Sequence, residues 1–370
     1  MRNAIYLDHN ATTPVLAPVA QAMGAALMKA GNASSVHGFG RAQNQRVAAA
    51  RAEVAQLTGA RPQNVIFTSG GTEANNLALT GSGRGLVIVT EIEHDSVLRA
   101  VDDPVLAPVG PDGIVDCAWL ADRLGQSLEP ALVCVMLANN ETGAIQPVAA
   151  IAEVARRHGA LVHCDAVQAA GRLPLDLDRL SVSSMALSAH KIGGPQGVGA
   201  LVLAADTALA PQLRGGGQER GRRAGTENVA GIVGFGVAAR LAQAERSNAS
   251  EALRDTLETR LRAAMPDAVV FGATAPRLGN TSCFAVPGLP AQTQLMALDL
   301  AGVAVSAGSA CSSGKVSQSH VLRAMKVAPD LADCAIRVSF GPGNCEDDIA
   351  RLLDILLALR GRIGQRQPAA

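Results

Sequence analysis

The stretch MALSAHKIGGPQGVGALVL (residues 185–203) predicts two strands with a lysine between them. Met185–Ser188 and Gly199–Leu203 are short apolar runs of the kind that form buried strands, and Lys191 follows the first run directly. Ligands of α/β sheets bind beside the carboxyl ends of the strands, so Lys191 stands where such a ligand is expected. Taken alone, a lysine in a surface turn is the simpler interpretation.

The surrounding sequence repeats the same alternation of strand and helix. Several of the strands are nearly continuous apolar runs, as expected when helices cover both faces of a mostly parallel sheet. Further strands are predicted over Val65–Thr68, Leu86–Thr90, Leu132–Ala138 and Leu161–Asp165, and helices over Arg41–Leu57 and Val148–His158. This part of the chain is therefore an α/β domain.

The carboxyl-terminal third has a different pattern. A long helical segment is predicted over Val229–Met265, where it crosses between domains, and the rest predicts a smaller α+β domain. Its strands are predicted over Val269–Phe271, Ser282–Val286 and Ala335–Phe340, and its last helix over Asp347–Arg360. A chain of 370 residues agrees with two domains.

Composition favours a small-molecule substrate. Lys plus Arg and Asp plus Glu are 32 each, so the formal net charge is zero, and no basic field attracts nucleic acid or an anionic membrane. The apolar runs are too short to span a bilayer, and the first 15 residues lack the pattern of a signal peptide. The 7 cysteines include no C-x-x-C pair, so we expect no metal site and a reducing cytoplasm.

Asp165 changes the interpretation of Lys191. It ends the strand Leu161–Asp165, so its carboxylate and the lysine amine point into one crevice. A lysine that forms a Schiff base and a carboxylate that keeps a pyridinium nitrogen protonated are the minimal protein groups for pyridoxal phosphate. The run TSGGTEANN (68–76) supplies a phosphate cradle, with Gly71 and Thr72 at a helix start, although glycine before a threonine cap is common.

Four polar residues after other strands are weaker candidates. His94 is placed to stack on a flat cofactor, although a lone histidine is more often structural. Asn140 and Gln168 are possible donors to a phenolic oxygen. Arg337 either grips a substrate carboxylate or extends from a strand edge to solvent.

Cys311 differs from the other cysteines. It lies in SAGSACSSG (306–314), among small residues that bury little surface. Such a segment has little burial energy to hold it in one place, so it can swing.

Together these segments resemble the NifS/IscS-like cysteine desulfurases of the class-V aminotransferase family, which feed sulfur to iron–sulfur cluster assembly. Eleven runs match in order: YLDHNATTP (6–14), GNASSVHGFG (31–40), FTSGGTEANN (67–76), EHDSV (93–97), NNETG (139–143), HCDAVQ (163–168), SAHKIGGPQGVG (188–199), GGGQERGRRAGTENV (215–229), SAGSACSSG (306–314), SHVLRAM (319–325) and IRVSFG (336–341).

The resemblance implies a pyridoxal-phosphate-dependent transferase of fold type I, active as a cytoplasmic homodimer. Its large domain, expected over residues 13–245, holds a mostly parallel seven-stranded sheet. A small α+β domain of residues 1–12 and 246–370 carries the cysteine. L-Cysteine is the implied substrate, and an acceptor or iron–sulfur scaffold protein takes the sulfur.

The resemblance also implies a role for each candidate. Lys191 binds the cofactor and moves the substrate's α-proton, and the nucleophile that takes the sulfur as a persulfide is Cys311. The remaining assignments are Asp165 on the pyridine nitrogen, His94 on the ring, Gln168 on the phenolate, Gly71, Thr72, Ser188 and His190 on the phosphate, Thr226 on the neighbouring subunit's phosphate, and Arg337 with Asn32 and Asn140 on the substrate carboxylate.

Alternatives remain on the same fold and outside it. A selenocysteine lyase or a C–S lyase uses a similar site, a transaminase has no need of Cys311, and a catalytically silent partner protein is expected to lack Lys191 or Cys311.

One departure from the family is Lys315–Gln318, where relatives carry an acidic residue and a proline. That change concerns loop motion and the choice of acceptor. The sequence leaves the receiving pathway open among cluster assembly, a nitrogenase-associated system and tRNA thiolation.

Overall fold

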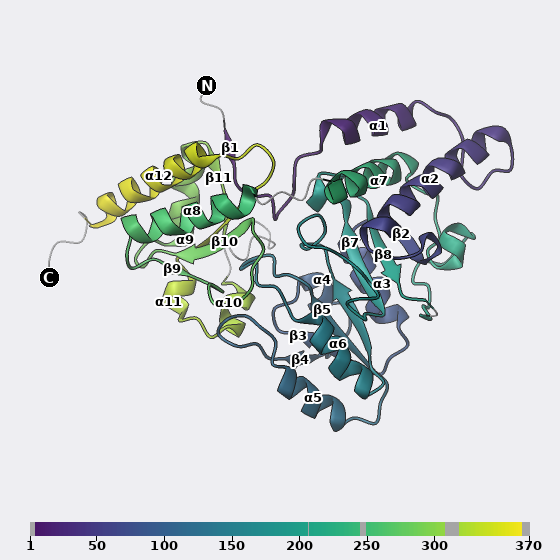
Figure 1. Ribbon diagram of the computed structural model, residues 1–370, viewed down its shortest axis with the longest axis horizontal. Helices are drawn as coiled ribbons and strands as arrows, with labels where there is room; N and C mark the ends of the chain where they lie inside the picture. Colours follow the sequence, from purple (N-terminus) through teal and green to yellow (C-terminus); the bar gives the residue numbers. More distant parts are fainter. Residues whose placement is uncertain (1–3, 206, 245–248, 308–317, 365–370) are drawn as a thin grey trace.

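The computed structural model describes residues 4–205, 207–244, 249–307 and 318–364. Its elements form two lobes, one around a large sheet and one around a small sheet (Figure 1). Cys311 and the segment 315–317 lie outside the described residues. Among the described residues, no helix is both long and apolar enough to cross a bilayer.

The large sheet has seven strands in the order β2-β8-β7-β6-β5-β3-β4. Only β8 runs antiparallel to its neighbours, which confirms the mostly parallel sheet. The strands are β2 (Val65–Thr68), β3 (Leu86–Thr90), β4 (Val105–Ala107), β5 (Ala131–Met136), β6 (Leu161–Asp165), β7 (Ser184–Ser188) and β8 (Gly199–Leu203).

The predicted strand Leu132–Ala138 ends two residues early, at Met136. Asn139 explains the early end, because its side-chain Oδ1 accepts from the backbone N–H groups of Glu141 and Thr142, both at 2.9 Å. Those bonds turn the chain out of the sheet and leave Asn140 facing the carboxyl ends of the strands.

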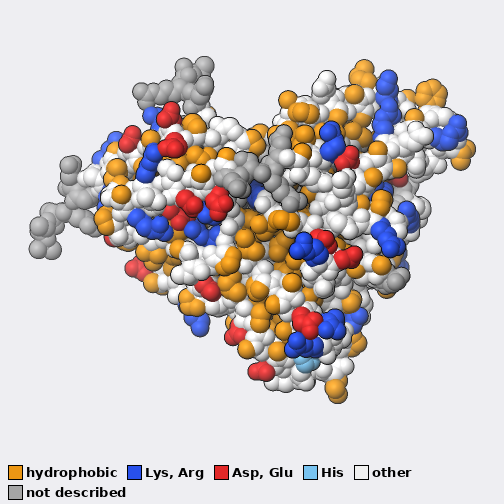
Figure 2. Space-filling model, viewed as in Figure 1, with side chains coloured by type: hydrophobic (Ala, Val, Ile, Leu, Met, Phe, Trp, Pro, Cys, Tyr) orange, Lys and Arg blue, Asp and Glu red, His pale blue; other side chains and the backbone are white. Residues whose placement is uncertain are grey.

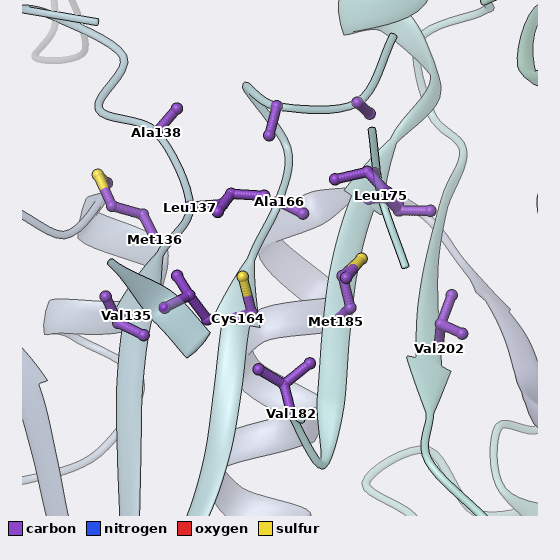
Figure 3. Close-up of a cluster of buried hydrophobic side chains, with 14 of the residues drawn as sticks. Val135, Met136, Leu137, Ala138, Cys164, Ala166, Leu175, Val182, Met185 and Val202 are labelled. Carbon is purple, nitrogen blue, oxygen red and sulfur yellow. The ribbon is translucent and has the colours of Figure 1, made fainter. Parts of the chain in front are cut away.

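The two faces of the large sheet carry separate apolar clusters. Figure 3 shows part of one, where Val135, Cys164, Met185 and Val202 project from β5, β6, β7 and β8. The opposite face is covered by α3 (Gly71–Gly81), which packs on β2, β6, β7 and β8. Because strand side chains alternate, His163 and Asp165 project to the α3 face.

The small lobe holds a four-stranded antiparallel sheet, ordered β12-β13-β10-β9, and a parallel pair of β1 with β11. The three strands and the last helix predicted here are confirmed, with shifted ends. The strands are β1 (Ile5–Tyr6), β9 (Val269–Val270), β10 (Thr281–Ala285), β11 (Val303–Ala304), β12 (Ser306–Ala307) and β13 (Ala335–Ser339). The domain limits at residues 12 and 245 stay a prediction.

The predicted helical segment Val229–Met265 contains two described helices. α7 (Val229–Ala244) packs on α1 (Ala17–Leu27) and α2 (Gly38–Leu57), whereas α8 (Ala249–Ala264) packs on α12 (Glu346–Gly364). The remaining helices are α4 (Asp95–Leu98), α5 (Cys117–Gly125), α6 (Val148–Arg157), α9 (Ala291–Leu300), α10 (His320–Ala324) and α11 (Pro329–Ala332).

Acidic and basic side chains are interspersed over both lobes on the face shown in Figure 2. Ion pairs between exposed side chains of the protein include Arg360 with Asp267 at 2.7 Å and Arg156 with Glu153 at 2.9 Å. Mixed charge of this kind agrees with the zero net charge of the chain.

Candidate active site

A cavity of about 320 Å³ lies at the carboxyl edge of the parallel strands, and Arg337 reaches it from the small lobe. Most of the predicted site residues line it: Gly71, Thr72, His94, Asn140, Asp165, Gln168, Ser188, His190, Lys191 and Arg337. A larger hollow of about 510 Å³ lies at the opposite edge of the sheet, beside Ser82, Leu177 and Ala204, away from these groups.

Three predicted site residues do not line this cavity. Asn32 and Thr226 are exposed on the surface of the chain, and the side-chain Oδ1 of Asn32 accepts from the backbone of Ser34 at 2.8 Å. Cys311 lies outside the described residues. Their roles stay predictions.

Lys191 is positioned by a short 3₁₀ turn that follows β7 at once. The turn spans Ala189–Ile192 and ends at Gly193, whose φ of 75° is left-handed. The Lys191 Nζ donates to the backbone carbonyls of Asn10 and Ala11, at 2.5 and 2.8 Å. These two carbonyls hold the amine at the floor of the cavity.

His190, next to Lys191, is neutral near pH 7. Burial and the positive charge of Lys191 lower the pKa of His190 to about 4. Its Nδ1 lies 3.1 Å from the hydroxyl of Thr12. A neutral imidazole at this position offers a hydrogen-bond donor to an anion without a full charge.

Asp165 ends β6 as a nearly buried carboxylate, 6% exposed. Its Oδ1 accepts from the backbone N–H of Val167 at 2.9 Å, and its Oδ2 from the Asn75 side-chain amide at 2.8 Å. Both donors are neutral, so neither offsets the charge of a carboxylate. A cation in the cavity, such as a protonated ring nitrogen, is the complementary partner.

His94 precedes α4 and caps it. The backbone N–H of Ser96 donates to His94 Nδ1 at 3.0 Å. Since Nδ1 accepts, the proton of the neutral imidazole is on Nε2. The ring therefore has a defined tautomer at the cavity wall.

The start of α3 forms a close cradle. A Cβ added to Gly71 would lie 2.9 Å from Val167 Cγ2, so only glycine allows this approach. Glu73 in the first turn binds Arg223 at 2.7 Å. Burial raises the pKa of Glu73, but hydrogen bonds from Arg223 and Ser69 bring it below its ordinary value. Because Arg223 offsets the negative charge of Glu73, the start of α3 still favours an anion.

Arg337 lies on β13 and is 3% exposed. Its Nη2 pairs with Asp8 at 2.5 Å and its Nη1 donates to the Asn140 carbonyl at 3.0 Å. Its Nε is buried and has no hydrogen-bond partner among the described residues. An unpaired buried donor beside the cavity is suited to an anionic ligand, because leaving it unpaired costs free energy.

Gln168 is already bonded within the protein. Its Nε2 donates to the Asn10 carbonyl at 2.9 Å, and its Oε1 accepts from Arg172. For the predicted bond to a phenolate, the Gln168 amide must either give up its bond to the Asn10 carbonyl or donate its second N–H to the phenolate.

Asp8, Asn10, Asn75 and Ser96 contact the predicted site residues and were not predicted as site residues. Asp8 and Asn10 lie in the run YLDHNATTP, and Asn75 in FTSGGTEANN, so the motifs contained them without a role. The contacts of Asp8, Asn10 and Asn75 with predicted site residues span 90 or more residues of sequence, which no local pattern reveals, whereas Ser96 lies two residues from His94 in the run EHDSV.

These groups fit pyridoxal phosphate. The cradle at Gly71 matches its phosphate, the Asp165 carboxylate matches its ring nitrogen, and the Lys191 amine matches its aldehyde carbon. The unpaired Nε of Arg337 adds a place for the carboxylate of an amino acid.

Comparisons with known proteins agree with this site. The model of the family described as aminotransferase class-V matches residues 5–352. A cysteine desulfurase of Cereibacter sphaeroides is 44% identical over 367 residues, covering 95% of this chain and 94% of that protein. An IscS-like cysteine desulfurase of Mycobacterium tuberculosis is 41% identical over 372 residues, covering 95% of each.

Solved structures show the same fold. A NifS-like protein from Rickettsia africae has a TM-score of 0.90 and 33% identity, covering 97% of this chain and 100% of that one. A second NifS-like protein has a TM-score of 0.87 and 34% identity, covering 97% and 100%. The family match over residues 5–352 extends over both lobes and includes the positions that line the cavity.

Proposed function

We propose how this chain, which belongs to the class-V aminotransferase family, performs the reaction for which its relatives are named. It is a pyridoxal-phosphate-dependent cysteine desulfurase that converts L-cysteine to L-alanine and takes the sulfur onto Cys311 as a persulfide. The observation that supports this most is the convergence of Lys191, Asp165, His94 and Arg337 on one cavity.

Each residue has a place in the proposed reaction. Gly71, Thr72, Ser188 and His190 hold the phosphate, and Asp165 holds the ring nitrogen. When bound, pyridoxal phosphate withdraws electrons from the substrate's α-carbon. Arg337 binds the substrate carboxylate, and Asn140 lies beside Arg337 in the wall of the cavity.

Lys191 moves the substrate's protons, and His94 assists as a hydrogen-bond donor. The Lys191 Nζ accepts the α-proton of the substrate and returns a proton at the end of turnover. Because His94 Nδ1 accepts from Ser96, the proton on its Nε2 is available to donate a hydrogen bond to the thiolate of Cys311. Sulfur transfer then forms an S–S bond from Cys311 to the substrate sulfur and breaks the substrate's C–S bond, and protonation gives alanine.

Cys311 must be a thiolate to attack. An exposed cysteine has a pKa of about 8.5 and is mostly protonated at neutral pH. Entry into the cavity is the step that removes its proton, which passes to the substrate's own groups, while the Nε2–H of His94 hydrogen-bonds the thiolate that forms. Alkylation of Cys311 across pH 6–9, with and without L-cysteine, tests this, and an unchanged thiolate fraction would count against it.

The homodimer and the roles of Thr226 and Asn32 belong to the same proposal. Thr226 is exposed and does not line the cavity of its own chain, as expected if it serves a neighbouring subunit, whereas Asn32 keeps its predicted place on the substrate carboxylate. Light scattering measures the dimer. A Thr226→Ala variant should bind pyridoxal phosphate more weakly while its dimer persists.

The sulfur goes on to an acceptor or iron–sulfur scaffold protein in the cytoplasm. Which of cluster assembly, a nitrogenase-associated system or tRNA thiolation receives it depends on the acceptor, and Lys315–Gln318 is the segment whose change should alter acceptor preference. Exchanging these residues for an acidic, proline-containing sequence should change persulfide transfer rates and leave alanine formation intact.

Product analysis tests the reaction class. The purified yellow protein is given L-cysteine and a thiol reductant, and alanine and sulfide in equal amounts are expected. Pyruvate with ammonia would indicate a C–S lyase instead. A strong preference for selenocysteine over cysteine would indicate a selenocysteine lyase.

A further inference from the structure

Behind Asp165 lies a chain of buried polar side chains that the proposed reaction does not use. It starts at Ser184 on β7, passes through His163 on β6 and reaches Asn75 on α3. Exposed fractions are 5%, 0% and 1% respectively, so these side chains are shielded from bulk solvent. Buried polar groups of this kind must satisfy one another.

Asn75 is the branch point. Its Nδ2 donates both to Asp165 Oδ2 at 2.8 Å and to Ser96 Oγ at 2.9 Å. The Ser96 Oγ in turn lies 2.8 Å from His94 Nδ1. The Asn75 amide therefore contacts Asp165, the proposed partner of the cofactor's ring nitrogen. Through the Ser96 hydroxyl it also reaches His94, the proposed partner of the ring face.

The direction of every hydrogen bond follows from the carboxylate. An ionised Asp165 only accepts, so the amide nitrogen of Asn75 faces it and the Oδ1 of Asn75 faces His163 at 2.9 Å. That oxygen only accepts as well, so the Nε2 of His163 carries a proton.

His163 is neutral, because burial lowers its pKa to about 3. A neutral imidazole has one proton, so its Nδ1 accepts from the Ser184 hydroxyl at 2.8 Å. The strand register places these two residues side by side, since His163 pairs with Ser184 across β6 and β7. The histidine therefore has a fixed tautomer, and that tautomer prevents the Asn75 amide from turning over.

We propose that Asn75 is a positioning residue that fixes Asp165 and His94 together against the cofactor, and that His163 sets the orientation of the Asn75 amide. This inference rests on the proposed cofactor site and adds to it the residues that align its two ring partners. Ser184 and Ser96 are the outer members of the same network.

The test measures cofactor binding rather than turnover. Asn75→Leu keeps the volume of the side chain and removes its hydrogen bonds. The dissociation constant of pyridoxal phosphate from this variant should rise roughly tenfold or more, since a bond to a charged group is lost. The visible circular dichroism of the bound cofactor should weaken, because the ring is no longer held at both partners.

A double-mutant comparison separates orientation from simple packing. His163→Leu should weaken cofactor binding less than Asn75→Leu, and the double variant should be no weaker than Asn75→Leu alone, within about twofold. His163→Gln keeps an N–H donor toward Asn75 and should restore binding relative to His163→Leu. Independent, multiplicative losses from the two sites would overturn the proposal.

Gln294→Leu is the matched control for the loss of a buried amide. Its Nε2 donates to the carbonyls of Leu289 and Cys334 in the small lobe, away from the cavity. Cofactor affinity and dichroism should stay within about twofold of wild type.

Should Asn75→Leu fail to fold, Ser96→Ala tests the His94 branch by itself. It should alter the cofactor's dichroism with a smaller loss of affinity, and an unchanged dichroism would overturn that branch. Wild-type protein that binds no pyridoxal phosphate would refute the proposed function itself. Wild-type binding together with unchanged Asn75→Leu and Ser96→Ala variants would refute this inference alone.

Discussion

Replacing Glu93 by glutamine should make the protein more stable relative to wild type as the pH rises. Glu93 is fully buried, and its Oε1 accepts from the Thr90 hydroxyl at 2.5 Å and from the Met136 backbone N–H at 2.7 Å. Within the part of the chain that the structure describes, its Oε2 has no hydrogen-bond partner. Burial, with a further contribution from the negative charge of Asp165, raises the pKa of Glu93 to about 8.

The sign follows from proton linkage. Because the folded pKa lies above the ordinary value of 4.5, the folded state keeps a proton that the unfolded state releases. Wild-type stability therefore falls between pH 4.5 and about 8 by roughly 1.4 kcal/mol per pH unit, and is level outside that window. Glutamine has the same shape, retains the Oε1 bonds and does not titrate, so its relative gain between pH 5 and 8 is about 4 kcal/mol.

Urea denaturation at pH 5, 6, 7 and 8, with saturating pyridoxal phosphate, measures this difference. Glu153→Gln is the control, because hydrogen bonds from Arg156 and Arg157 lower the pKa of Glu153 and keep its titration below this range. Its difference from wild type should stay level. Parallel stability curves for wild type and Glu93→Gln would refute the reasoning.

Three further predictions come from single contacts. Arg337→Lys removes the bidentate guanidinium and should raise the KM for L-cysteine roughly tenfold or more while the cofactor stays bound, as measured by initial rates. Gly341→Ala places a Cβ 2.0 Å from His9 Nδ1 and should cost about 1–3 kcal/mol in denaturation, whereas Gly24→Ala, inside α1 and with open space for the Cβ among the described residues, should stabilise the protein by about 0.5–1 kcal/mol. Ser319→Ala removes both the cap that accepts from the Leu322 N–H and the bond that its hydroxyl donates to the buried Glu141, and should cost about 1–3 kcal/mol, measured the same way.

Six of the seven strands of the large sheet were predictable, because each is a short apolar run between turn residues, whereas β4 (Val105–Ala107) was not predicted. Val65–Thr68, Leu86–Thr90 and Leu161–Asp165 were predicted with their observed limits. In contrast, β1 and β12 have two residues each, too few to show a period, and form only because a partner strand from a distant part of the chain lies beside them.

The candidate site was predictable where chemistry follows a strand end, as for Lys191 and Asp165. It was not predictable where a residue acts through its neighbours. His163 lies inside an apolar strand run and has no local feature that separates it from a structural histidine. Only the fold places α3 over that face and brings Asn75 within 2.9 Å of it.

The central claim is that the substrate sulfur passes to Cys311. Mass spectrometry of the purified protein, quenched after a limited amount of L-cysteine without reductant, tests it directly. The peptide that contains Cys311 should gain the mass of one sulfur atom as alanine appears, and Cys311→Ser should retain the cofactor but form neither product. An unmodified Cys311 peptide during alanine formation, or full turnover by Cys311→Ser, would contradict the account.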